Sequence, residues 1–183
     1  MAPTKIYFIR HAEKPDEAKR TNGVLPDGSI DKESLTVKGW QRAGALTQMT
    51  WPGTASAPTT IFAAGIGPGS DSKRPQQTVT PLAELLNERN ILSKFDTTCL
   101  KSDLDGLFAR ILDAEGVVLV CWEHHLLPDL LDKFPHAPPA PKKWPDDRFD
   151  MNWCLESKDG GWSFSQIPQN LLKGDRSDVF PQN

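Results

Sequence analysis

Cysteine, long apolar runs and an excess of charge of one sign are all scarce in this sequence of 183 residues. The three cysteines, Cys99, Cys121 and Cys154, are an odd set without the C-x-x-C spacing of zinc sites, which argues against a disulfide framework and against a zinc site. No stretch approaches the ~20 apolar residues that span a bilayer. The first nine residues lack the longer apolar segment and the cleavage site of a signal peptide. We therefore expect a cytoplasmic, reducing location.

The two signs of charge nearly balance, with 21 Lys and Arg against 24 Asp and Glu and a formal net charge of −3. Such a chain has no basic field for nucleic acid or for an anionic membrane, so we expect neither as a partner. Any anion-binding site must be built locally from a few cations. Hydrophobic residues make up 38% and charged residues 25% of the chain, which is typical of a globular protein. The length predicts a single domain over residues 1–183.

Short apolar runs alternate along the chain with stretches of helical periodicity. Buried strands are predicted at 6–9, 59–64 and 117–122, with a weaker strand signal at 92–98. Helices are predicted after a cap at Thr36, over 73–89, from Ser102 or Asp103 onward, and over 126–134. Two alternating segments, 149–155 and 162–167, flank Gly160-Gly161 and predict a hairpin. This order predicts an α/β fold with three helix–sheet–helix layers, a mainly parallel central sheet and a C-terminal edge hairpin.

Cationic and titratable side chains follow the ends of the predicted strands. Arg10 and His11 follow the first strand, Arg74 lies between the second strand and its helix, and His124 follows 117–122. Ligands bind beyond the carboxyl ends of parallel strands, so we expect these four residues to share a site. Arginine matches a phosphate dianion with a planar charged fork. A neutral imidazole can attack phosphorus, and a second, protonated imidazole can stabilise the transition state, so the set predicts phosphoryl chemistry.

Four segments resemble signatures of the histidine phosphatase superfamily, which includes the cofactor-dependent phosphoglycerate mutases. The segment 10–13, Arg-His-Ala-Glu, resembles the RHG signature, with Ala at the third position. Residues 35–43 are similar to the LTxxGxxRA segment, and residues 70–78 to the SPxxRAxQT segment, with its serine, arginine, glutamine and threonine retained. Trp122-Glu123-His124 resembles the segment of the second histidine, with Glu where Gly or Ser is usual. The agreement extends over roughly residues 3–135, and the compact size resembles the small phosphohistidine phosphatases.

This resemblance implies a metal-independent phosphatase without a cofactor. His11 would be the nucleophile, with Arg10, Arg74 and His124 forming the phosphate pocket, and a phosphomonoester or phosphoamide would be hydrolysed through a phosphohistidine on His11. The expected partner is a small phosphorylated substrate or a phosphoprotein. Ser70 and Glu13 join Arg10 and Arg74 as candidate substrate-binding residues, whereas we interpret His125 as a pocket wall or a helix-start residue.

The general acid that protonates the leaving oxygen stays open at this stage. Asp103 lies in the window beyond Arg74 where the mutase branch has its glutamate, but a helix cap explains it equally well. Glu123, beside His124, is a second candidate, and Glu13 is a third. Three other functions also stay open. They are a phosphomutase, a non-catalytic phosphate-binding or regulatory domain, and a scaffold recruited for non-phosphate acid–base chemistry.

Overall fold

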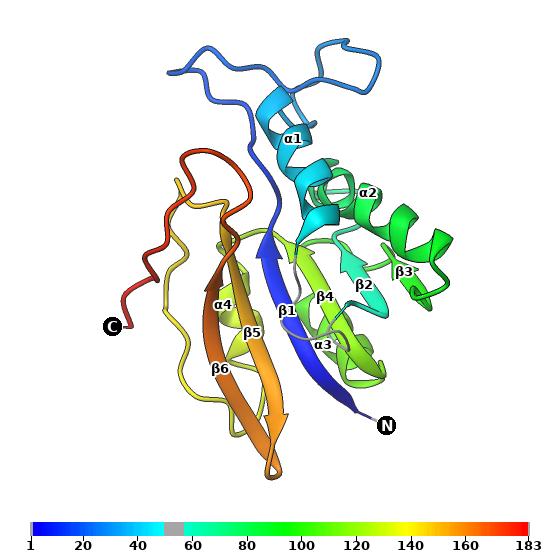
Figure 1. Cartoon of the computed structure of the whole chain (residues 1–183), viewed down its shortest axis with the longest axis vertical. Coiled ribbons are helices and arrows are strands. Elements are labelled where there is room, and N and C mark those ends of the chain that lie inside the picture. The colour runs from blue at the N-terminus through cyan, green and yellow to red at the C-terminus, as the bar shows by residue number, and fades with distance from the viewer. Residues whose placement is uncertain (1, 50–56, 183) are drawn as a thin grey trace.

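The computed structural model describes residues 2–49 and 57–182, and a six-stranded sheet runs through this part of the chain (Figure 1). The strands are β1 Pro3–Arg10, β2 Thr60–Ala63, β3 Lys94–Asp96, β4 Gly116–Trp122, β5 Met151–Lys158 and β6 Gly161–Pro168, in the spatial order β3-β2-β4-β1-β5-β6. The first four of these strands pair in parallel, whereas β5 is antiparallel to β1 and β6 to β5. The predicted α/β class, with a mainly parallel sheet and an edge hairpin, is confirmed.

Helices cover both faces of the sheet and give the predicted three layers. They are α1 Val37–Ala45, the 3-10 turn η1 Leu46–Gln48, α2 Arg74–Glu88, α3 Leu104–Leu112 and α4 Leu127–Leu131. The alternation of β1 sends Ile6 and Phe8 into a core under α3 and α4. It sends Tyr7 and Ile9 into a second core under α2 and η1, and α1 packs against α2. No helix among the described residues is both long and apolar enough to cross a bilayer.

The hairpin turn lies one residue earlier than its glycine pair predicted. Asp159 and Gly160 form the loop between β5 and β6, with φ values of +49° and +81°. A two-residue loop with positive φ at both positions suits the twist of the flanking strands, and aspartate tolerates the left-handed region better than most residues do. Gly161 is therefore the first residue of β6. The weak strand signal at 92–98 corresponds to the three residues of β3.

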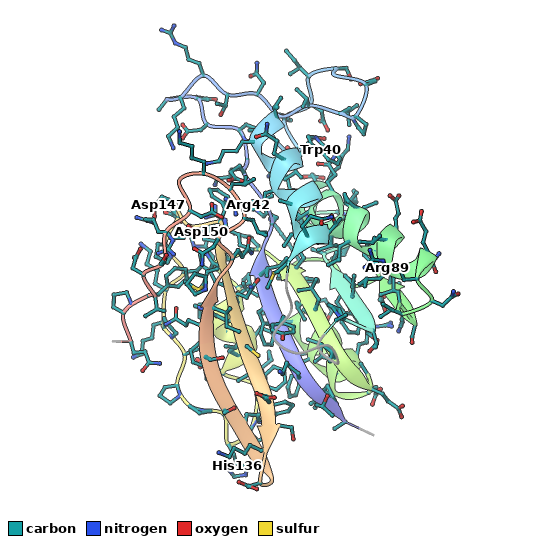
Figure 2. All side chains as sticks on the ribbon, viewed as in Figure 1. Trp40, Arg42, Arg89, His136, Asp147 and Asp150 are labelled. Carbon is teal, nitrogen blue, oxygen red and sulfur yellow. The ribbon has the colours of Figure 1, made fainter. Side chains whose placement is uncertain are left out.

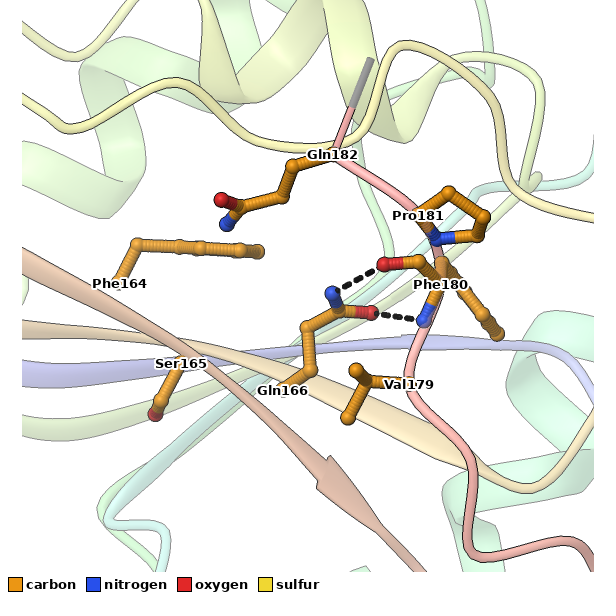
Figure 3. Close-up of a pocket in the computed structure, with 7 residues that line it drawn as sticks. All are labelled: Phe164, Ser165, Gln166, Val179, Phe180, Pro181 and Gln182. Carbon is orange, nitrogen blue, oxygen red and sulfur yellow. Dashed lines mark hydrogen bonds between the residues drawn. The ribbon is translucent and has the colours of Figure 1, made fainter.

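The C-terminal tail, which carries no periodic pattern, is fixed to the sheet by its side chains and main chain. The Gln166 amide Nε2 donates to the carbonyl oxygen of Phe180 at 2.9 Å, and its Oε1 accepts from the Phe180 N–H at 2.9 Å (Figure 3). The Phe180 ring is buried against Trp144 and Trp153, with ring centroids 5.1 Å and 6.0 Å away. Buried Arg148 adds an ion pair to Asp178 at 3.0 Å.

Candidate active site

Strands β1 and β4 end side by side (Figure 1). The residues that follow these two ends help to line a cavity of about 180 Å³. Arg10 is paired with Trp122 at the last register position, and the His11 N–H donates to the carbonyl oxygen of Trp122 at 3.3 Å. The two strands therefore deliver the residues after their ends to one place. The cavity is lined by His11, Lys14, Ala64, Ser70, Ser72, Arg74, Pro75, Lys101, Glu123, His124 and His125.

The His11 imidazole is buried and held in one tautomer. Its Nδ1 lies 2.8 Å from the carbonyl oxygen of Ala12. Because a carbonyl oxygen only accepts, Nδ1 carries the proton, and the lone pair of the neutral ring is on Nε2. Burial above all, reinforced by the charges of Arg10, Arg74 and His124, holds the pKa of His11 well below its ordinary value of 6.5, although the bond to Ala12 opposes the shift. At neutral pH Nε2 of His11 is therefore unprotonated, as a nucleophilic nitrogen must be.

Arg10 is a buried cation without a carboxylate partner among the described residues. Its Nη1 donates to the main-chain oxygens of Asp146 at 2.6 Å and Arg148 at 3.3 Å, and the guanidinium lies 3.9 Å from the centre of the Phe149 ring. Its Nε and Nη2 are buried and have no partner. Burial lowers the pKa of Arg10 to about 10, so the group stays charged at neutral pH. A buried charge of this kind is costly unless an anion compensates it.

Further unsatisfied polar atoms surround the cavity. Arg74 donates through Nη1 to the carbonyl oxygen of Lys32 at 2.9 Å, and its Nη2 lies 3.7 Å from Glu33 Oε2, but its Nε is buried without a partner. Ser72 Oγ and His124 Nδ1 are in the same condition. Buried polar groups are normally hydrogen-bonded, so such a cluster marks the cavity as a place where water or a polar ligand can bind. Among the charged residues that line it, Lys14, Arg74 and Lys101 outnumber Glu123, which favours an anion.

His124 receives a partner that the sequence did not indicate. Its Nε2 lies 2.7 Å from Asp146 Oδ1, and because a carboxylate only accepts, Nε2 carries the proton of the neutral ring. Burial lowers the pKa of His124 to about 4, although the bond to Asp146 opposes the shift. The exposed His125 stacks on His124 with ring centroids 3.8 Å apart, and its Nε2 lies 3.5 Å from the same Asp146 oxygen. Asp146 belongs to a proline-rich loop, where no periodic pattern marks it.

Two of the predicted carboxylates are engaged away from this cavity. Glu13 receives Arg42 Nε at 3.0 Å and Nη2 at 2.9 Å, and it lines a separate cavity of about 760 Å³ instead. Asp103 is exposed and caps α3, with Oδ1 accepting from the Gly106 N–H at 2.9 Å. Neither side chain is placed to bind substrate or to act as the acid in the cavity of His11. Among the described residues Glu123 is the one carboxylate that lines it.

The remaining motif residues build the frame of the site. Thr78 Oγ1 accepts from the Ala12 N–H at 2.8 Å and thereby fixes the residue next to His11. Ser70 lines the cavity, but its hydroxyl donates to the carbonyl oxygen of Gly65 at 2.6 Å. Thr36 caps α1 as predicted, because its side chain accepts from the Gly39 N–H at 3.1 Å. At positions 36, 70 and 78 a side-chain hydroxyl therefore makes a hydrogen bond to the main chain.

No protein-family model and no curated sequence matches the chain, so its likeness to known proteins comes from structure. YhfR of Bacillus stearothermophilus superposes with a TM-score of 0.50 at 15% identity, over 96% of this chain and 98% of that one. A proposed alpha-ribazole-5'-P phosphatase of Escherichia coli superposes with a TM-score of 0.52 at 10% identity, over 90% and 96% of the two chains. Both are members of the histidine phosphatase superfamily. This chain has the histidine phosphatase fold. At such low identity the likeness establishes the fold, and the roles of single residues depend on the geometry of the cavity.

Within this histidine phosphatase fold, the cavity brings together three of the four residues that the sequence predicts to share a site. His11, with its neutral imidazole, Arg74 and His124 line it, whereas Arg10, the chain neighbour of His11, is not among the lining residues. Glu123, His124 and His125 also form a group of metal-ligand type, with one ligand atom of each within 4.8 Å of the others. No other group of this kind occurs in the described ranges 2–49 and 57–182.

Proposed function

We propose that the protein is a metal-independent phosphatase that hydrolyses a phosphomonoester or a phosphoamide through a phosphohistidine on His11. The observation that carries this proposal is the Arg10 guanidinium, whose buried Nε and Nη2 have no partner, next in the chain to a neutral His11 whose Nδ1 is already bound to the main chain. A phosphate dianion would satisfy the buried donors of Arg10 and Arg74. It would also face the lone pair of His11 Nε2 within the cavity of about 180 Å³.

In the first step His11 Nε2 attacks phosphorus, and the bond from phosphorus to the leaving oxygen or nitrogen breaks. Arg10 and Arg74 hold the equatorial oxygens and offset their negative charge. The bound dianion would raise the pKa of His124, so that the ring becomes protonated and its Nδ1–H donates to the phosphoryl group. Asp146 keeps the ring in place through the bond to Nε2 at 2.7 Å.

Glu123 is the acid that this geometry supports. In its protonated form it would give a proton to the leaving group, and in the second step its carboxylate would take a proton from the water that attacks phospho-His11. Water oxygen then bonds to phosphorus, the bond to Nε2 breaks, and inorganic phosphate leaves. Its position in the cavity favours Glu123 over Asp103 and Glu13, which are held at a helix cap and by Arg42.

The deciding experiment is rapid quenching of the enzyme with a phosphate-labelled aryl phosphate. We expect an alkali-stable, acid-labile label on the wild-type chain, release of labelled phosphate in excess of enzyme, and survival of both in a chelator. His11→Ala should lose the label and the turnover, whereas His136→Asn, at a distant exposed histidine, should keep both. A label that persists in His11→Ala would refute the proposal. Isomerised product would indicate a mutase, and phosphate binding without turnover a binding domain.

The role of Glu123 has a separate readout in the nature of the leaving group. Glu123→Gln should slow turnover of alkyl phosphates by about 10²–10⁴-fold, the usual contribution of a general acid. Aryl phosphates, whose leaving oxygen needs little protonation, should be affected far less. Equal losses for both substrate types would remove Glu123 from the role of acid and leave the phosphohistidine step untouched.

A further inference from the structure

Three consecutive residues after β4 combine the ligand types that zinc prefers. Glu123, His124 and His125 each present one carboxylate oxygen or ring nitrogen, and these atoms lie within 4.8 Å of one another. All three residues line the cavity that contains His11. Two imidazoles and a carboxylate, with a fourth position left to water, are the ligand set of many zinc sites.

His124 has the orientation that a metal ligand needs. Its side chain is only 2% exposed, and its Nδ1 is buried without a partner. Its other ring nitrogen, Nε2, donates to Asp146 Oδ1 at 2.7 Å. Histidines that bind metals nearly always donate their second N–H to a carboxylate or a carbonyl, which fixes the ring and raises its basicity. The pair of Asp146 and His124 therefore leaves Nδ1 as the nitrogen available to a cation.

The other two ligands are free enough to close around an ion. The His125 side chain is 54% exposed, and Glu123 is half-buried. Tetrahedral zinc with bonds of about 2.0–2.1 Å places its ligand atoms about 3.4 Å apart. The ligand atoms, now within 4.8 Å of one another, would therefore have to approach by rotation of these two side chains when the ion binds.

We propose that Glu123, His124 and His125 form an inhibitory zinc site, with Asp146 positioning His124. Zinc would occupy His124 Nδ1, the atom that otherwise faces the phosphoryl group, so metal and substrate exclude one another. The inhibition rests on the proposed phosphatase function, whereas the binding of zinc does not. Zinc bound at this site would therefore inhibit the enzyme, although the proposed reaction itself uses no metal.

Zinc titration of the metal-free protein against a chromophoric chelator tests the binding directly. We expect one equivalent of zinc on the wild-type chain and at least about tenfold weaker binding in His125→Ala. Asp146→Asn should weaken binding by roughly 10–100-fold, as is usual when a partner of a ligating histidine is lost. The matched control is His136→Asn, because His136 is exposed near the tip of the β5–β6 hairpin, at the opposite end of the sheet (Figure 2).

Thiolates do not compete in this titration, because all three cysteines are buried and burial raises the pKa of each thiol. Failure to bind one equivalent would overturn the proposal, as would equal affinities in wild type, His125→Ala and Asp146→Asn. The second arm measures phosphatase rates with and without zinc, each variant against its own metal-free rate. Zinc should inhibit the wild type reversibly and His125→Ala much less. Activation by zinc would overturn the inhibitory role, and absence of any phosphatase activity would refute the proposed function while leaving the binding result intact.

Discussion

Arg42 connects three remote parts of the chain, and its removal is a strong test of how the structure is held together. The guanidinium donates to Glu13 at 2.9 Å, to Asp175 at 2.8 Å and to Gln169 at 3.2 Å. Its side chain is only 3% exposed, and that of Asp175 only 4%. Arg42 thus joins α1 to the segment after β1 and to the C-terminal tail (Figure 2).

Arg42→Met keeps much of the side-chain length but leaves Asp175 buried without its cation and Glu13 with only the exposed Lys38, 3.7 Å away. Breaking a buried ion pair from one side costs about 3–5 kcal/mol. In a chain of this size each kcal/mol lowers the melting temperature by about 2–4 °C, so we expect a loss of about 6–20 °C. The measurement is thermal and urea unfolding at pH 7. Arg89→Met, at an exposed arginine at the end of α2, is the matched control and should change the melting temperature by only a degree or two.

The pH dependence separates lost charge pairing from lost packing. Burial favours a raised pKa for Asp175, but the bonds from Arg42 and from two main-chain N–H groups outweigh it and lower the pKa below 3.8. Stabilisation by a carboxylate with a lowered pKa is present above its unfolded pKa and is lost as pH falls through the folded value. The gap between wild type and Arg42→Met should therefore narrow below about pH 4. A loss under about 1 kcal/mol at pH 7, or a gap independent of pH, would refute this account of Arg42.

Three further results are expected. The decrease of kcat/KM toward acid pH should begin below pH 6.5, because neutral His11 is the active form and its pKa is lowered from that value. A decrease that begins above pH 6.5 would contradict this. Thr78→Val should cost about 1–3 kcal/mol in urea unfolding and also reduce kcat, because it leaves the Ala12 N–H buried without an acceptor. Gly39→Ala should lower the free energy of unfolding by about 1–3 kcal/mol, because its Cβ would lie 2.6 Å from the main-chain oxygen of Glu13. Gly44→Ala, whose Cβ would meet no atom from outside its own helix within 4 Å, should stabilise α1 by up to ~1 kcal/mol. Equal effects of the two substitutions on unfolding would show that the close contact is not decisive.

The sequence predicts the fold and the site residues best where a strand and the residue that follows it lie in one short segment. The apolar run before Arg10 and the one before His124 each predict a buried strand, and parallel strands bring the residues after their ends to the same edge of a sheet. The caps at Thr36 and Asp103 are equally local, because a side chain there bonds to an N–H three residues later.

Contacts between distant segments could not be predicted in the same way. Glu13 lies beside the RHG-like segment, and nothing near it in sequence indicates that Arg42 takes its carboxylate. Asp146 stands in a loop of prolines and charges without periodicity, so its bond to His124 depends on the path of that loop through space. In both cases the two partners are far apart in the sequence, so only the folded path of the chain brings their side chains together.

The segment that follows β6 also constrains when the fold can be completed during translation. Asp175 supplies a charge to Arg42 and Asp178 one to Arg148, while Phe180 closes the aromatic cluster around Trp153. Because synthesis proceeds from the N-terminus, the ribosome has finished every strand before any of these partners emerges. A nascent chain stalled before residue 175 would expose two arginines and an apolar surface to chaperones, so these contacts of the native state form only after residues 175–180 have been translated.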